Sequence, residues 1–158
     1  MTSNWQGYTN KRLFHARLLL DSWRDADAVA KPAYRESCLN AMVMAHRSLL
    51  AEIMNNYQLL VTELPSLDEA VSALSHKDEA SSELGYMEQL IQQDSWLSAL
   101  LKAYQECMMP QCSQTSERMM IPLTHSGSTN MNDEESAGKV LESLKELVTY
   151  SRNFSLEW

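Results

Sequence analysis

His46 is the residue whose type and position most invite chemistry. It interrupts an apolar stripe that recurs at helical spacing on both sides of it. A buried imidazole can bind a metal ion or transfer protons near neutral pH, and Glu52 and Asn56, farther along the same predicted helix, could join it in a polar patch. The alternative, which the sequence favours, is a core histidine that is metal-free and hydrogen-bonded to a neighbouring helix.

The other potential ligands do not complete a metal centre. A di-iron bundle needs Glu-x-x-His pairs on facing helices, and none of the 4 histidines has a glutamate three positions before it. Cys107, Cys112 and His125 could supply three soft ligands, but their spacing is not that of a zinc knuckle and a fourth ligand is not evident. We therefore expect no metal and no cofactor, and two unligated cysteines.

One pattern points to phosphodiester chemistry. Arg118 and His125 precede the last predicted helix, an arrangement that resembles in outline the Arg–His pair of helical nucleotide-binding and ribonuclease domains in toxin–antitoxin systems. However, Pro122 lies between them and the surrounding segment is not basic. The alternative to a non-catalytic protein is therefore a ligand- or phosphodiester-handling enzyme, with its site near His46 or in the 110–132 segment.

The elements that would position these residues are long helices. The chain has 158 residues, enough for one core, and its 4 Gly and 4 Pro are too few for a fold with many tight turns. We predict a single all-α domain over residues 1–158, an up-and-down four-helix bundle with a short helical insertion between the second and third long helices. Residues 110–132 are expected to form a long irregular loop.

Hydrophobic periodicity and capping residues set the expected helix bounds. The first helix should begin at Thr9 or Asn10 and end near Ala30, and the second should run without a break from Ala33 to Leu64. Leucines and isoleucines on these stripes should be buried, namely Leu49, Ile53, Leu60, Leu100 and Leu144. The remaining helices are expected from the capping box at Ser66 to about Ser75, from about Ser82 to Gln92, from Asp94 or Ser95 to Pro110, and from Asn132 or Asp133 to Arg152.

The net charge and the number of cysteines indicate which partners the protein can bind and in which cellular compartment it is expected. The net charge of −8 disfavours binding to nucleic acid and to anionic lipid. Basic residues predominate from Lys11 to Arg47 and acidic residues from Ser66 to Ser95, an asymmetry that suits docking of opposite patches. The apolar run at Leu18–Leu20 is far too short to span a membrane. With 3 cysteines and no secreted framework, a reducing cytoplasm is expected.

Several short motifs resemble a known family. The run Tyr8-Thr9-Asn10-Lys11, followed by Ala16-Arg17-Leu18, is similar to the opening of a bacterial, mainly gammaproteobacterial, family known only as a domain of unknown function. The run Asp94-Ser95-Trp96-Leu97 and the terminal Trp158 are similar as well. The resemblance spans the whole chain. It implies a bacterial, cytosolic protein and carries no catalytic residues with it.

The function that the sequence favours is a non-catalytic protein–protein interaction module. It is expected to be a homodimer, with an unknown protein partner as a further possibility. Aromatic and apolar side chains outside the main helical stripes would form the interface, namely Trp5, Tyr8, Phe14, Phe154, Leu156 and Trp158. Because burying one such side chain is worth roughly 1.5–3 kcal/mol, we expect at least one of them in an interface of about 1,000 Å² or more.

Overall fold

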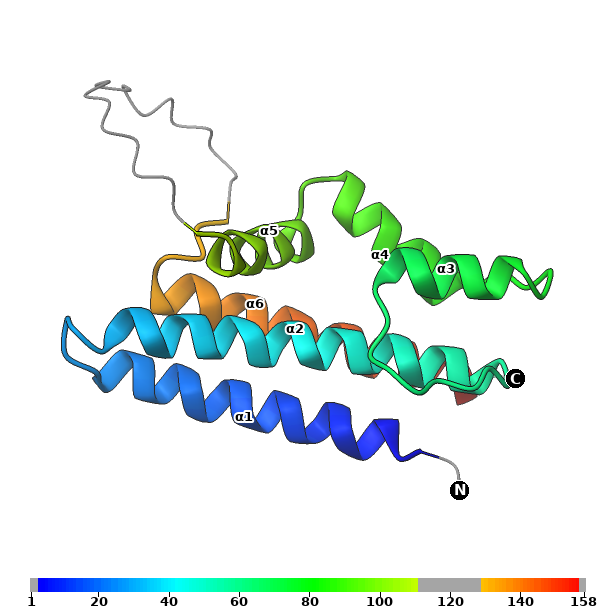
Figure 1. The fold of residues 1–158 in the computed structure, drawn as a ribbon, viewed down its shortest axis with the longest axis horizontal. Coiled ribbons are helices and arrows are strands. Elements are labelled where there is room, and N and C mark those ends of the chain that lie inside the picture. The colour runs from blue at the N-terminus through cyan, green and yellow to red at the C-terminus, as the bar shows by residue number, and fades with distance from the viewer. Residues whose placement is uncertain (1–2, 111–128, 157–158) are drawn as a thin grey trace.

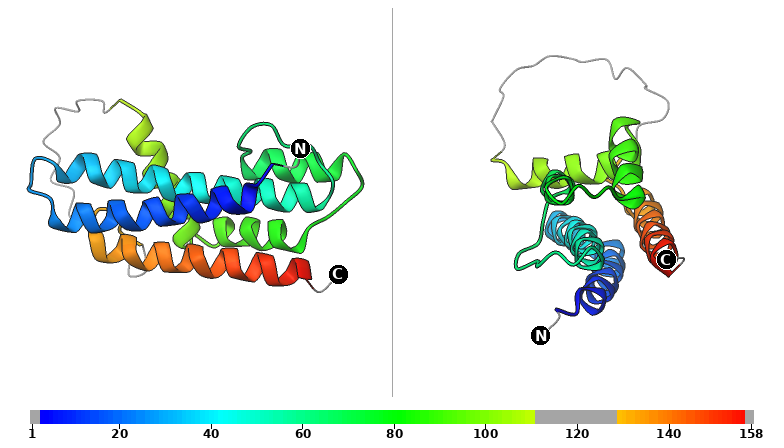
Figure 2. Two further views of the ribbon diagram at one scale, coloured as in Figure 1. Left: turned by 90° about the horizontal axis from the view of Figure 1, so that it is seen from below. Right: turned by 90° about the vertical axis from the view of Figure 1, so that its right-hand side faces the viewer.

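Three long helices lie side by side and a fourth crosses them. The computed structural model describes residues 3–110 and 129–156, and every regular element in those ranges is an α-helix (Figure 1). Viewed along the long axis, α1, α2 and α6 are seen nearly end-on, whereas α5 runs across them (Figure 2). The predicted all-α class is confirmed. The helices are α1 (Trp5–Asp25), α2 (Lys31–Asn56), α3 (Leu67–Ser75), α4 (Ser82–Gln92), α5 (Trp96–Met108) and α6 (Glu134–Leu156).

The start of α1 lies a full turn earlier than the sequence predicted. We expected Thr9 or Asn10 to cap the helix, but the cap is Asn4, whose side-chain oxygen accepts a hydrogen bond from the amide of Gly7 at 2.8 Å. Thr9 is instead a buried helical residue. The extra turn brings Trp5 into the helix and against the core.

The end of α1 also differs from the prediction. The helix stops at Asp25 rather than near Ala30. Asp27 follows the helix end, and its side chain accepts hydrogen bonds from the amides of Val29 and Ala30. This aspartate turn reverses the chain directly into α2, where Pro32 occupies the first turn.

The predicted extension of α2 to Leu64 is wrong. The helix ends at Asn56 because Gln58 takes a left-handed conformation, with φ of 58°. The amide of Leu59 then donates to the carbonyl of Met54 at 3.1 Å, which closes the helix end in the Schellman manner. No glycine marks this point, so the chain carries no evident helix-stop signal before Pro65.

Four of the five residues that were predicted to be buried are buried, and the exception lies beyond the end of α2. Leu49, Ile53, Leu100 and Leu144 are buried, as predicted. Leu60, in contrast, is 88 % exposed, because it lies beyond the last turn of α2. The helical spacing of apolar residues therefore predicts burial only up to Asn56, where α2 ends.

Two faces of α2 are buried, since α1 packs on one side of it and α3, α5 and α6 pack elsewhere around it. The face toward α1 carries small residues, which let the two helices approach closely. The Cys38 thiol donates to the carbonyl of Ala16 across this contact, and the hydroxyls of Thr9 and Ser48 share a buried hydrogen bond.

The shorter helices agree with the predicted bounds. The capping box at the start of α3 is present, with reciprocal hydrogen bonds between Ser66 and Glu69. α4 has the predicted bounds, and Ser95 caps α5. α6 begins at Glu134 and extends one turn beyond the expected end at Arg152. No helix in the described ranges is both long enough and apolar enough to cross a bilayer.

Candidate functional site

Glu52 lies in a polar junction that ties α2 to α6 and α1. The Arg152 guanidinium donates to both carboxylate oxygens of Glu52, at 2.9 and 3.0 Å. The same guanidinium donates to the side-chain oxygen of Asn10 at 2.9 Å and to the carbonyl of Gln6 at 3.4 Å. The Glu52 side chain is only 11 % exposed, so this bidentate pair is mostly shielded from water.

Asn56 belongs to the same end of the molecule. Its amide donates to the hydroxyl of Ser155 on α6 at 3.1 Å. Glu52 and Asn56 also share a polar pocket of about 410 Å³ between the ends of α1 and α2. Glu52 and Asn56, two of the three residues of the predicted polar patch, therefore line the same pocket. The pocket is lined by Ser3, Asn4, Trp5, Gln6, Glu52, Asn55 and Asn56.

His46 lies apart from this pocket, in the core. It is 2 % exposed, as predicted, and it lines neither this pocket nor the two others described below. The expected hydrogen bond from another helix is absent: neither ring nitrogen has a partner within the described chain. Burial, with a smaller contribution from the charge of Arg47, lowers the pKa of His46 to about 4. The imidazole is therefore neutral at physiological pH.

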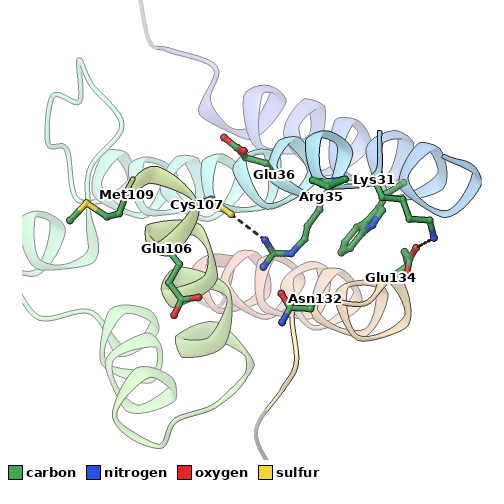
Figure 3. Close-up of a pocket in the computed structure, with 10 residues that line it drawn as sticks. Lys31, Arg35, Glu36, Glu106, Cys107, Met109, Asn132 and Glu134 are labelled. Atoms are coloured by element: carbon green, nitrogen blue, oxygen red, sulfur yellow. Dashed lines mark hydrogen bonds and ion pairs between the residues drawn. The ribbon is translucent and has the colours of Figure 1, made fainter. Parts of the chain in front are cut away.

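A second pocket, of about 510 Å³, lies at the opposite end of the helices (Figure 3). Arg35 crosses it, donating to the carbonyl of Met131 at 2.9 Å and to the sulfur of Cys107 at 3.3 Å. Lys31 pairs with Glu134, and this hydrogen bond lowers the pKa of Glu134. The cations of the pocket thus already have partners on α5 and at the start of α6. The lining residues are Trp23, Lys31, Pro32, Arg35, Glu36, Glu106, Cys107, Met109, Asn132 and Glu134.

The cysteines do not form a cluster in the described residues. Cys38 is a free, buried thiol, and burial raises its pKa to about 12, so it remains protonated. Cys107 is also free. Cys112 and His125, the other two residues of the predicted soft-ligand set, lie outside the described residues. Within residues 3–110 and 129–156, no three acidic, histidine or cysteine side chains are grouped as a metal site would require.

α1 carries a second regular seam, on the side opposite the core. The buried side chains of α1 lie on one face of the helix. The residues on the opposite face follow one another at steps of four and three positions. Phe14 and Leu18 in the middle of this face are 58 % and 48 % exposed. α1 lies along the outer edge of the molecule, so this face has no partner in the described chain (Figure 1). The seam consists of Gly7, Lys11, Phe14, Leu18, Asp21 and Asp25.

The comparisons with known proteins identify the family. The model of a family of unknown function, DUF6586, matches residues 1–158. The chain belongs to this family. The family resemblance expected from the sequence is thus confirmed over the whole chain. No curated protein and no solved structure matches it.

The N-terminal aromatic residues differ in their surroundings. Trp5 is partly buried against the core and makes an edge-to-face contact with Tyr8, with ring centroids 6.0 Å apart. Arg12 lies over the Tyr8 ring and donates to its hydroxyl. Of the three predicted interface residues at this end, Phe14 is thus the one most available to a partner.

The C-terminal residues show a similar division. Phe154 is partly buried and lies against Tyr150, with ring centroids 6.2 Å apart. Leu156 is 83 % exposed. Trp158 lies outside the described residues. The sequence did not reveal that Arg152, expected only to close the last helix, pairs with Glu52 and so joins three helices.

Proposed function

We propose that the chain is a non-catalytic interaction module that forms a homodimer through the outer seam of α1. The observation that carries this proposal is the exposure of Phe14 and Leu18 at the centre of a regular helical face. A seam with steps of four and three residues is the pattern by which two helices interdigitate. Each apolar side chain removed from water there would contribute roughly 1.5–3 kcal/mol.

The charges on the seam support an antiparallel arrangement about a twofold axis. Lys11 lies on the N-terminal side of the apolar pair, and Asp21 and Asp25 lie on its C-terminal side. If two α1 helices pack antiparallel with the axis midway between Phe14 and Leu18, each Phe14 meets the partner's Leu18. Each Lys11 then meets the partner's Asp21. Opposite charges at matching positions would fix the register and the orientation of such a pair.

Association should be measured by light scattering and sedimentation at micromolar concentration. The wild-type chain is expected to be a dimer, and Phe14→Glu should convert it into a monomer with an unchanged helical spectrum. Val29→Glu is the matched control, because Val29 is 91 % exposed and lies outside the seam. A monomeric wild type, or a dimer that survives Phe14→Glu, would contradict the proposal.

Charge reversal tests the register. Lys11→Glu and Asp21→Lys should each weaken the dimer by bringing like charges together. The double variant should restore it, because the two opposite charges meet again in exchanged positions. Weakening that persists in the double variant would argue against the antiparallel pairing.

Two further points bear on the proposal. We place the protein in the cytoplasm, since Cys38 and Cys107 carry free thiols and reduced thiols persist in that compartment. The enzyme alternative has less support in the described residues, because a substrate could not reach the buried ring of His46 without a rearrangement. Arg118 and His125, on which the phosphodiester alternative also depended, lie outside those residues.

A further inference from the structure

A small pocket lined by aromatic side chains lies between α6 and the helices α4 and α5. Its volume is about 300 Å³, at the lower end of the range for small-ligand pockets. One wall is a stripe on α6 at steps of three, one and three residues, which places all its members on one face of the helix. This stripe consists of Ser143, Glu146, Leu147 and Tyr150.

The opposite wall comes from two other helices. Tyr86 projects from the middle of α4, and Trp96 is the first residue of α5. The rings of Tyr86 and Tyr150 have centroids 5.2 Å apart and planes inclined at 54°, so they meet at an angle rather than stacking. Tyr86 and Tyr150 remain 40 % and 44 % exposed. The pocket therefore presents three aromatic rings to one small space.

Glu146 supplies a negatively charged carboxylate to this pocket. Its neighbour Glu142, one turn away on α6, is paired with Lys145 at 2.7 Å. Glu146 makes no ion pair and no hydrogen bond with any residue in the described ranges. None of the six lining residues is a lysine, arginine or histidine. Arg17 and Lys145 line a neighbouring groove together with Glu146, but neither forms an ion pair with its carboxylate in the described residues.

We propose that this pocket binds an organic cation, either an ammonium or a guanidinium group. The faces of aromatic rings carry partial negative charge and attract cations, most strongly when several rings surround one ligand. A carboxylate beside the rings adds a Coulomb attraction and disfavours anions. The acidic surplus of the segment from Ser66 to Ser95, which includes α4, acts in the same direction.

The organic cation that fills this pocket can come from two sources. A free quaternary or primary ammonium compound can fill a pocket of this size, and so can the lysine or arginine side chain of another protein. The site is separate from the outer seam of α1. Binding here therefore does not depend on the proposed dimer, and Phe14→Glu should leave it unchanged.

The test is an NMR titration of the full chain that follows the indole resonance of Trp96. Choline is the first probe, and 3,3-dimethyl-1-butanol is its neutral isostere. We expect choline to shift the resonance and saturate it at millimolar concentration, and the neutral compound to bind about tenfold more weakly, in line with the cation–π and carboxylate contributions together. Added salt should weaken binding of choline and not that of the isostere.

Variants assign the binding to the proposed groups. Glu146→Gln should weaken choline binding about three- to fivefold, the value of a partly exposed charge pair. Tyr150→Leu should weaken it at least about threefold through loss of one ring. Glu142→Gln is the matched control, since Glu142 lies on the same helix but is paired with Lys145 outside the pocket. Circular dichroism checks that each variant remains folded.

A second set of ligands separates the two sources. Short Gly-Ser peptides that carry a single lysine, trimethyllysine or arginine are titrated in the same way. A peptide that binds more tightly than choline assigns the pocket to a protein side chain, and a choline preference assigns it to a small molecule. Equal binding of the neutral isostere, unchanged affinity in Glu146→Gln, or no shift of Trp96 by any cation would overturn the proposal.

Discussion

Glu52 and His46, two polar side chains on α2, are buried in opposite ways. Glu52 is mostly buried, yet both of its oxygens receive hydrogen bonds from Arg152. His46 is more deeply buried, and both of its ring nitrogens lack a partner in the described chain. Residues from three helices meet around Glu52, whereas no described residue forms a hydrogen bond with the His46 ring.

The difference follows from where each residue lies along α2. Glu52 is close to the helix end, where the start of α1 and the end of α6 bring polar groups within reach. His46 lies in the middle of the helix, among apolar side chains of the core. An unpaired polar group in such surroundings costs free energy of folding, whereas a well-paired one does not. The polar junction should therefore raise the free energy of unfolding, and the unpaired His46 should lower it.

Removal of Arg152 is expected to have the largest effect. Arg152→Ala leaves the Glu52 carboxylate shielded and without its counter-charge, and it also removes the link to Asn10. Because the Arg152 side chain is 26 % exposed, we expect a loss of about 2–3 kcal/mol, below the full cost for a completely buried pair. The free energy of unfolding in urea measures it.

A surface ion pair provides the matched control. Lys139 and Glu135 are paired at 3.1 Å on α6, but their side chains are 75 % and 82 % exposed. Lys139→Ala should change the free energy of unfolding by less than about 0.5 kcal/mol. Similar losses in Arg152→Ala and Lys139→Ala would show that the polar junction stabilises the fold no more than an exposed ion pair does.

Replacement of His46 is expected to have the next largest effect, in the opposite direction. The folded-state pKa of about 4 lies below the ordinary value of 6.5. As the pH falls below 6.5, the unfolded chain binds a proton that the folded chain does not, so stability is lost between pH 6.5 and about pH 4. His46→Leu removes this loss. Its stability advantage over wild type should grow by about 2 kcal/mol between pH 7.5 and pH 5.

The control for this pH effect is a histidine at the surface. His76 is exposed at the end of α3, so His76→Gln should leave the pH dependence of unfolding as in wild type. Urea denaturation of both variants at the two pH values decides the matter. An advantage of His46→Leu that does not change with pH would mean that the folded protein protonates His46 as readily as the unfolded chain does, and it would contradict this prediction.

The predictability of the fold from sequence depended on whether a local signal was present. The capping box at Ser66 and the spacing of apolar residues fixed α3 and α4 correctly. The end of α2 was missed because Gln58, not glycine, takes the left-handed conformation there. Asp78 and Asp94 do the same after α3 and α4, and aspartate tolerates this conformation better than glutamine does.

The candidate sites were predictable only in part, since their partners come from distant segments. His46 was correctly expected to be buried from its position on the stripe. Its lack of a hydrogen bond could not be foreseen, because it depends on which side chains other helices present. The pairing of Glu52 with Arg152 joins residues on α2 and α6. No local spacing encodes such a contact, and only the packing of the helices reveals it.

The smallest of the expected effects concerns a third way of burying polarity, at the contact of α1 with α2. The hydroxyls of Thr9 and Ser48 lie 2.5 Å apart, and each is also within hydrogen-bond distance of a backbone carbonyl, that of Trp5 for Thr9 and that of Ala45 for Ser48. Two hydroxyl protons thus serve three contacts, so one contact always lacks a proton. Compensation here is better than at His46 and poorer than at Glu52.

Ser48→Ala and Thr9→Val should therefore each cost about 1 kcal/mol, the net value of one buried hydrogen bond. The double variant should cost clearly less than the sum of the two, because it leaves neither hydroxyl without its partner. Unfolding in urea of the four proteins of this cycle gives the coupling energy. Additive losses would mean that the two hydroxyls do not interact, and that their carbonyl acceptors alone account for their burial between the helices.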